Sequence, residues 1–132
     1  MFSNIVNAGQ EPLTLPILNV IDGDTIESSL NLPIPLNKVY IRVNGIDTPE
    51  STHLAKCHKE QMAGGKAKEY MRRLLKSSVT MVITDYKWDK YGGRIDANVF
   101  IDNINVGEAM IKAGLALPYN GRGDKPDWCK LL

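Results

Sequence analysis

The sequence has no hydrophobic run long enough to cross a membrane. Its 132 residues are 43% hydrophobic and 23% charged, the balance of an ordinary globular domain. No apolar stretch approaches the ~18 residues of a transmembrane helix. No basic residue precedes Lys38, and residues 1–16 hold no apolar core, so we expect no secretory signal. The sequence is compatible with a cytoplasmic protein and with one exported after signal removal.

Cysteine and histidine are scarce, with two residues each. Cys57 and Cys129 lack the C-x-x-C spacing of zinc and redox sites. Three arrangements stay open for them. They form two free thiols, or a disulfide that closes a long loop in an oxidising compartment, or Cys57 joins His53 and His58 in a metal cluster that lacks a fourth ligand.

The sequence also has almost no net charge. Sixteen Lys and Arg against fifteen Asp and Glu give +1, with a pI of about 7.7, whereas a strongly basic nucleic-acid binder usually shows a pI above ~9. The charges are segregated, however. Residues 1–50 hold two bases and six acids, while residues 51–76 hold seven bases and two acids. The basic block is either a solvated helix face or a surface for phosphates.

Hydrophobic periodicity predicts five strands and two helices. Alternation is most regular over residues 38–44, as in a strand with one buried face. Helical spacing marks residues 60–76 and the segment after Asn105, a typical N-cap. Residues 1–16 show little pattern and are expected to form a loose arm before a single domain, residues 17–132. The strands are expected over 17–22, 25–29, 38–44, 79–86 and 95–101.

This order of elements favours an α+β fold. Five short strands with a helix after the third are expected of a five-stranded OB-type Greek-key β-barrel, here with two to three helices. Pro33 and Pro35 exclude residues 30–37 from a central strand, so a loop or hairpin tip is expected there.

Acidic residues gather where predicted strands end. Asp22-Gly23-Asp24 joins the first two strands, and Asp47 follows the third. A barrel brings Asp24 and Asp47 together, and calcium relieves the repulsion between close carboxylates. A plain turn is the alternative for the Asp-Gly-Asp trio. An EF-hand loop is excluded, because its sixth position is Glu27 and not glycine.

Two arginines and a glutamate complete the set of candidate residues. Arg42 lies on the polar face of its strand, and Arg94 follows a double-glycine turn. A guanidinium holds two phosphate oxygens at once. Glu50 beside a bound phosphate could take a proton from water. Each residue alone has an ordinary surface role as its alternative, but their combination in one short chain favours phosphodiester chemistry.

Several blocks of the sequence resemble the signature blocks of the staphylococcal nuclease family. They are VIDGDT at 20–25, Arg42 with IDTPE at 46–50, DKYGGR at 89–94, and residues 105–116. The resemblance spans about residues 17–120. It implies an OB-type barrel and a calcium-dependent endonuclease that cleaves DNA or RNA.

The resemblance also implies roles for the acidic residues. Asp24, Asp47 and the carbonyl group of Thr48 would bind calcium, with Asp22 nearby as an outer group. Glu50 would be the general base that activates the attacking water. The bond from phosphorus to the 5′ oxygen would break and leave a 3′ phosphate.

The remaining roles concern the substrate. Arg42 and Arg94 would hold the phosphate, Lys90 and Tyr91 would contact a neighbouring phosphate, and Tyr119 would stack on a base. Two departures from the family pattern stand out. The double glycine before Arg94 adds one residue, and the long basic C-terminal helix is absent from this sequence.

Other functions compete with this one. A non-catalytic OB-fold module that only binds nucleic acid is the main alternative, and an assembly protein that keeps only the fold is another. Degenerate relatives would be expected to lose the metal-binding acids or the base, which this chain keeps. We expect a monomeric protein whose substrate is nucleic acid and which does not associate with a membrane. The sequence leaves open the choice between DNA and RNA, the site preference and the biological role.

Overall fold

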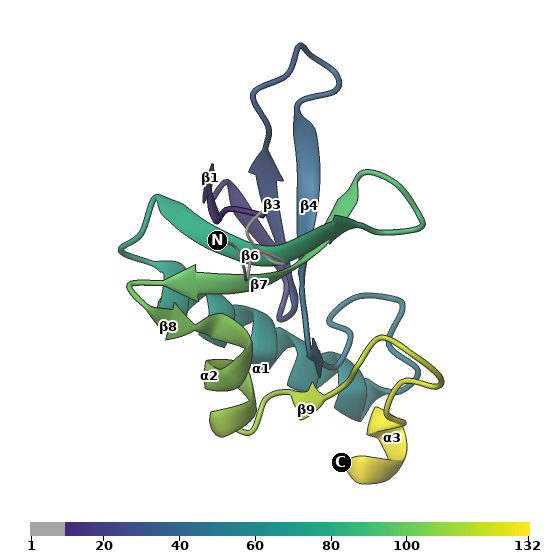
Figure 1. The fold of residues 1–132 in the computed structure, drawn as a ribbon. Coiled ribbons are helices and arrows are strands. Elements are labelled where there is room, and N and C mark those ends of the chain that lie inside the picture. Colours follow the sequence, from purple (N-terminus) through teal and green to yellow (C-terminus); the bar gives the residue numbers. More distant parts are fainter. Residues whose placement is uncertain (1–9) are drawn as a thin grey trace, which may run out of the picture.

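A curled mixed β-sheet forms the body of the protein in a computed structural model that describes residues 10–132 (Figure 1). The strands follow the order β1-β6-β7-β4-β3-β2, with β4 and β7 parallel and the other neighbours antiparallel. The strands of this path are β1 (Leu13–Pro16), β2 (Asn19–Asp22), β3 (Thr25–Ser29), β4 (Lys38–Val43), β6 (Thr80–Trp88) and β7 (Arg94–Ile101).

Three short strands and three helices complete the fold. Strand β8 (Ile104–Asn105) pairs with β7, while β5 (Ile46–Asp47) and β9 (Leu117–Pro118) form a separate pair. Helix α1 packs against β2, and α2 packs against β7. The helices are α1 (His58–Leu75), α2 (Val106–Lys112) and α3 (Trp128–Leu131). None of the helices over residues 10–132 is long and apolar enough to cross a membrane.

Alternating side chains give the central strands one apolar and one polar face. Along β4 the residues Val39, Ile41 and Val43 are buried, and their neighbours Ile95 and Ala97 on β7 are buried with them. Because successive side chains of a strand point to opposite faces, the residues between them share the other face. That face carries Tyr40, Arg42, Arg94 and Asp96 on the two strands, in the pairs Tyr40–Arg94 and Arg42–Asp96.

The structure confirms the predicted α+β, OB-type architecture, and the five predicted strands all form. Helix α1 begins at His58 and not at residue 60. Asn105 caps α2 as expected, because its side chain accepts a hydrogen bond from the backbone N–H of Glu108. No strand forms over residues 30–37, which extend from the ends of β3 and β4 as a projecting loop (Figure 1).

The prediction of a loose arm up to residue 16 is wrong for its last residues. Leu13–Pro16 forms strand β1, which pairs with the edge of β6, and Leu15 joins the core. The sequence pattern did not indicate this strand, because Pro12 precedes it and Pro16 is its last residue. An edge strand tolerates proline, since one of its sides needs no ladder hydrogen bond. Residues 1–9 of the predicted arm lie outside the described residues.

A disulfide joins Cys57 to Cys129, with their Cα atoms 6.1 Å apart. This finding decides among the three arrangements that the sequence left open. It excludes two free thiols, and it excludes the cluster with His53 and His58, because a disulfide sulfur is no longer a thiolate ligand. The bond spans 72 residues and ties α3 to the residue that precedes α1.

Candidate active site

Two buried aspartates share one arginine at the end of the sheet. Asp24 lies in the turn between β2 and β3, Arg42 on β4, and Asp47 in β5. Asp24 is 7% exposed and Asp47 is 2% exposed. Arg42 Nη2 lies 3.5 Å from Asp24 Oδ2 and 3.6 Å from Asp47 Oδ1. The fold thus brings together three residues that lie far apart along the chain.

Hydrogen bonds satisfy most oxygens of this acidic pair, but not all. Asp24 Oδ2 accepts from the backbone N–H of Thr48 at 3.2 Å, and Asp47 Oδ2 accepts from the indole N–H of Trp128 at 2.8 Å. Asp47 Oδ1 is buried without a hydrogen-bond partner. Burial, and to a lesser degree the nearby Asp24 charge, raise the pKa of Asp47. The acidic pair therefore holds a buried carboxylate oxygen that no hydrogen-bond donor satisfies.

These residues fit a hard divalent cation. An orphaned, buried carboxylate oxygen beside a second carboxylate is an oxygen donor set of the kind that calcium prefers. Across residues 10–132 no group of three or more His, Cys, Asp or Glu side chains is arranged to hold a metal. A calcium ion here would therefore depend on two carboxylates, a backbone carbonyl such as that of Thr48, and water.

Glu50 lies next to this pair, together with Asp22. Asp22 Oδ1 accepts a 2.6 Å hydrogen bond from the Ser51 hydroxyl, and burial raises the pKa of Asp22. The side chain of Glu50 is half-buried. Burial, followed by the charges of Asp22 and Asp24, raises the pKa of Glu50 to about 7. A carboxyl group with a pKa near neutrality suits proton transfer.

The first turns of α1 hold the backbone of Glu50 in place. Glu60 is 6% exposed, and its Oε2 accepts from the N–H of Glu50 at 3.1 Å while its Oε1 accepts from the N–H of Lys56 at 2.9 Å. Gly64 faces the same loop so closely that a Cβ there would overlap the carbonyl group of Glu50. A Cβ at Gly65 would meet nothing within 4 Å.

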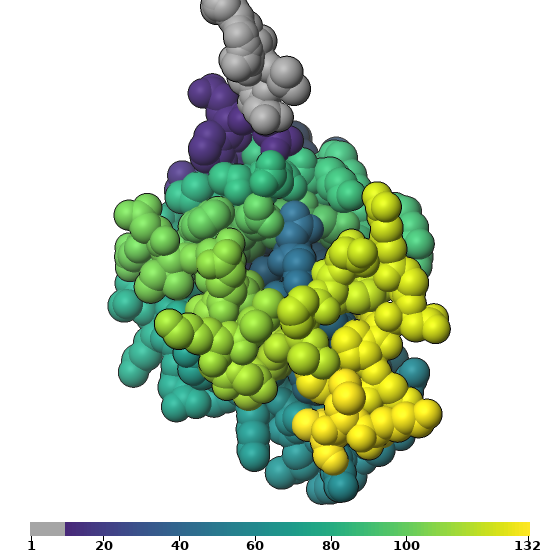
Figure 2. Space-filling model, turned by 60° about the horizontal axis from the view of Figure 1, so that its bottom comes forward, coloured from purple at the N-terminus to yellow at the C-terminus, as the bar shows by residue number. Residues whose placement is uncertain are grey.

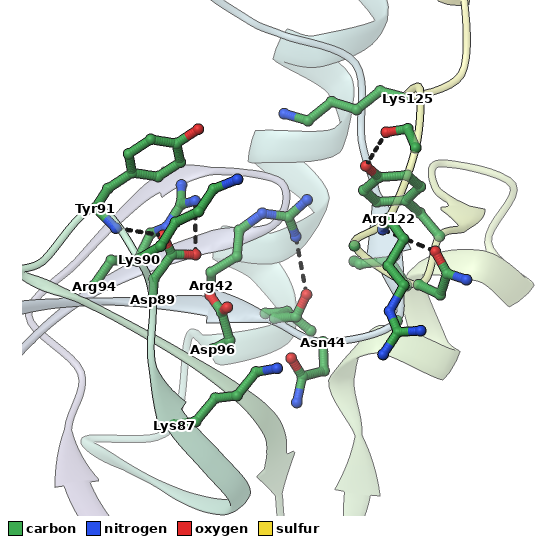
Figure 3. Close-up of a pocket in the computed structure, with 17 residues that line it drawn as sticks. Arg42, Asn44, Lys87, Asp89, Lys90, Tyr91, Arg94, Asp96, Arg122 and Lys125 are labelled. Carbon is green, nitrogen blue, oxygen red and sulfur yellow. Dashed lines mark hydrogen bonds and ion pairs between the residues drawn. The ribbon is translucent and has the colours of Figure 1, made fainter.

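A cationic groove adjoins the acidic pair (Figure 3). It encloses about 570 Å³, and Arg42 stands between its two walls. One wall comes from β6, β7 and their connecting turn, and the other from the segment after β9. The cationic and aromatic residues that line the groove are Arg42, Lys87, Lys90, Tyr91, Arg94, Tyr119, Arg122 and Lys125.

The groove residues are held by their own contacts. Arg94 Nη2 lies 3.0 Å from Asp89 Oδ2, and its guanidinium lies 5.7 Å from the centre of the Tyr91 ring. The Tyr119 hydroxyl donates to the carbonyl of Gly123 at 2.8 Å. Figure 2 shows the C-terminal segment in yellow beside a hollow, and the blue of residues near 40 is visible at its floor.

The structure gathers the residues predicted from the sequence into two adjoining sets. Asp24, Asp47 and Thr48 meet at the acidic pair, with Asp22 and Glu50 beside them. The other five line the groove, namely Arg42, Lys90, Tyr91, Arg94 and Tyr119.

Sequence reasoning missed five residues of this region. Lys87, Arg122 and Lys125 complete the groove, Glu60 fixes the loop of Glu50, and Trp128 binds Asp47. Lys87 follows an irregularity of β6 between Thr84 and Lys87 that shifts the alternation, so the sequence pattern did not give its orientation. The other four depend on tertiary contacts and carry no local signal.

The two neighbouring glycines of α1 give a matched pair for mutation. We expect Gly64→Ala to lower the free energy of unfolding by about 2 kcal/mol, because the new methyl group overlaps the backbone of Glu50. Gly65→Ala should raise it by up to about 1 kcal/mol, since alanine favours a helix and meets open space there. Urea unfolding of both variants measures the difference. Equal stabilisation by the two substitutions would contradict the close approach of α1 to this loop.

The raised pKa of Glu50 predicts a pH-dependent cost to stability. Its folded pKa of about 7 lies above the ordinary value of 4.5, so this carboxyl loses stabilising free energy as pH rises from below 4.5 through 7. Glu50→Gln should therefore be more stable than the wild type at pH 8 by about 1 kcal/mol, a discounted figure because the side chain is half exposed. Below pH 4 the two proteins should match.

Urea unfolding in the presence of a chelator, at both pH values, tests this expectation. Glu11→Gln serves as a control on an exposed glutamate in the segment before β1. An advantage of Glu50→Gln that is the same at pH 8 and pH 4 would show that its cause is not the charge.

Comparison with known proteins is consistent with this geometry. A family profile described as staphylococcal nuclease homologue matches residues 40–128. An uncharacterized endonuclease of Escherichia coli is 32% identical over 111 residues, which are 83% of this chain and 63% of that protein. A probable staphylococcal-like nuclease of Oryza sativa subsp. japonica, CAN1, is 31% identical over 93 residues, which are 70% of this chain and 25% of that protein.

The chain therefore spans less than two thirds of the length of these curated relatives. The match to the family profile covers residues 40–128, more than half of the chain, and it includes Arg42, Asp47, Glu50 and Arg94. On this ground, the chain belongs to the staphylococcal nuclease homologue family.

Proposed function

We propose that this chain is a calcium-dependent nuclease that hydrolyses the phosphodiester bonds of DNA or RNA. One observation carries the proposal: the buried pair Asp24 and Asp47 shares Arg42 with a groove lined by cations. The groove suits a polyanion, because its basic side chains face one another across a space open to solvent. The acidic pair suits a cation, and it adjoins the groove at Arg42, where a phosphate would bind.

Glu50 is the base in this proposal. Its carboxylate takes a proton from a water molecule, whose oxygen attacks the phosphorus atom. The bond from phosphorus to the 5′ oxygen breaks, that oxygen gains a proton, and the phosphate stays on the 3′ side. A pKa raised to about 7 by burial and by nearby acids supports this role, since a base is most effective when its pKa lies near the working pH.

Arg42 and Arg94 hold the phosphate. They lie on adjacent parallel strands and share one face of the sheet, and both line the groove. Their guanidinium groups neutralise the charge that grows on the phosphate oxygens in the transition state. Arg94 is already oriented by Asp89 and Tyr91, so little reorganisation is needed when a phosphate arrives.

Asp24, Asp47 and the Thr48 carbonyl would hold calcium. When bound, calcium polarises a phosphate oxygen and adds positive charge beside it. The orphaned Oδ1 of Asp47 supports this assignment. Lys90, Tyr91 and Tyr119 would contact the rest of the substrate through charge and stacking. The names of the Escherichia coli and rice relatives, an endonuclease and a probable nuclease, support the class of reaction.

A cleavage assay separates this proposal from a module that only binds nucleic acid. Single-stranded and duplex DNA are incubated with the protein in calcium or in a chelator, and the products are tested for a 3′ phosphate. We expect cleavage in calcium only. Glu50→Gln and Arg42→Ala should each slow it at least about 100-fold. Arg72→Ala, on the exposed side of α1, is the control and should cleave normally.

The assay also has an outcome that would end the enzyme hypothesis. Wild-type protein that binds DNA but releases no product in calcium would leave the binding module as the function. Binding by Glu50→Gln that equals the wild type would agree with either reading, so the decision rests on the cleavage itself.

The groove predicts which basic residues contact the substrate. We expect Lys87→Ala with Arg122→Ala to reduce the slope of log affinity against log salt by roughly 1.4 for single-stranded DNA, because two phosphate contacts are lost. Arg72→Ala with Arg73→Ala removes the same charge from α1, which contributes nothing to the groove, and should leave the slope unchanged. Fluorescence anisotropy with a labelled oligonucleotide in chelator measures both. Equal slopes for the two double variants would contradict the groove.

A further inference from the structure

Trp128 is buried outside the main hydrophobic core. It is 8% exposed, yet it does not belong to the cluster of apolar side chains that fills the sheet. Its indole N–H instead donates a 2.8 Å hydrogen bond to Asp47 Oδ2, across 81 residues of sequence. The single hydrogen-bond donor of this large aromatic side chain is thus used by one of the two buried aspartates of the site.

The position of this indole is fixed independently of Asp47. The disulfide ties Cys129, the next residue, to Cys57 in front of α1. Asp127 caps the first turn of α3 by accepting from the N–H of Lys130 at 3.3 Å. At the other end of the segment, the N–H of Tyr119 donates to the carbonyl of Gly45 at 2.9 Å. The indole N–H of Trp128 is therefore held in place by contacts that do not involve Asp47.

Because of this hydrogen bond, the two carboxylate oxygens of Asp47 have different surroundings. Oδ2 accepts from Trp128, while Oδ1 has no hydrogen-bond partner and faces Arg42 at 3.6 Å and Lys125 at 4.0 Å. A donor on one oxygen fixes the plane of a carboxylate and directs the other oxygen. Groups that orient the ligands of a metal in this way commonly set its affinity.

We propose that Trp128 is a positioning residue that holds Asp47 with Oδ1 directed toward the cation. The inference rests on the calcium site of the proposed function and deepens it. Trp128 touches neither the substrate nor the ion, and acts only through Asp47. Without the indole donor, Asp47 Oδ2 becomes a second buried orphan, and the carboxylate is free to rotate.

The test compares Trp128→Phe with Trp88→Phe. Phenylalanine keeps an aromatic ring but lacks the N–H, and Trp88 is 61% exposed and neither bonds to the aspartates nor lines the groove. Calcium affinity is measured by titration calorimetry without nucleic acid. We expect Trp128→Phe to bind calcium about tenfold more weakly than the wild type, and Trp88→Phe to bind it equally well. Thermal unfolding in chelator verifies that each variant is folded.

A second measurement does not need Trp128→Phe and therefore holds if that variant does not fold. The two indole N–H resonances are followed in ¹⁵N-labelled protein during a calcium titration, and Trp88→Phe assigns them. The Trp128 resonance should shift with the same calcium dependence as the heat signal, and the Trp88 resonance should stay in place. A Trp128 resonance that does not move with calcium would show that the indole is not coupled to a calcium-bound Asp47.

The outcomes separate this inference from the proposed function. Wild-type protein that binds no calcium overturns both. Wild-type protein that binds calcium, with equal affinity in Trp128→Phe and Trp88→Phe or with an unmoved Trp128 resonance, overturns the positioning role alone.

Discussion

Burying like charges beside one another is the constraint on which this molecule is built. Asp24 and Asp47 are withdrawn from water at the end of the sheet, and burial raises the pKa of Asp47. The structure offsets the penalty with the Arg42 guanidinium, the Thr48 N–H and the Trp128 N–H. One carboxylate oxygen is left over. That remainder of negative charge is the source of the affinity for a cation that we propose.

The compensating groups come from separate parts of the fold. Several elements of this small domain must therefore be held together at the acidic pair. The turn after β2 and strand β5 carry the two aspartates, while strand β4, the residue after β5 and helix α3 supply the three compensating groups. Helix α1 adds the support of Glu50 through Glu60 and Gly64. A displacement of any one element would leave a charge or a donor unpaired in a buried position, where the cost is high.

Much of this arrangement could be predicted from the sequence. Alternation located the central strands, and a strand register is enough to place Arg42 and Arg94 on one polar face. The acidic residues lie in short motifs at the ends of strands, so their meeting followed from the fold class. The family resemblance was the stronger guide to their roles, because an Asp-Gly-Asp turn by itself has an ordinary structural explanation.

The rest could not be predicted, and for physical reasons. Gly64 and Gly65 are neighbours in one helix, and the packing of α1 against residue 50 distinguishes them. Glu60 looks like an ordinary acid in the first turn of a helix, where negative charge is favoured in any case. The pairing of Cys57 with Cys129 depends on a distance between Cα atoms that no spacing reveals.

The long sequence separation of Trp128 from Asp47 also has a consequence for the newly made chain. A ribosome delivers the sheet and both aspartates well before residue 128, since synthesis proceeds from the N-terminus. The nascent protein thus holds an acidic pair whose last hydrogen-bond donor is still to be translated, 81 residues after Asp47. The final order of this centre is gained only after α3 has emerged and the disulfide between Cys57 and Cys129 has formed.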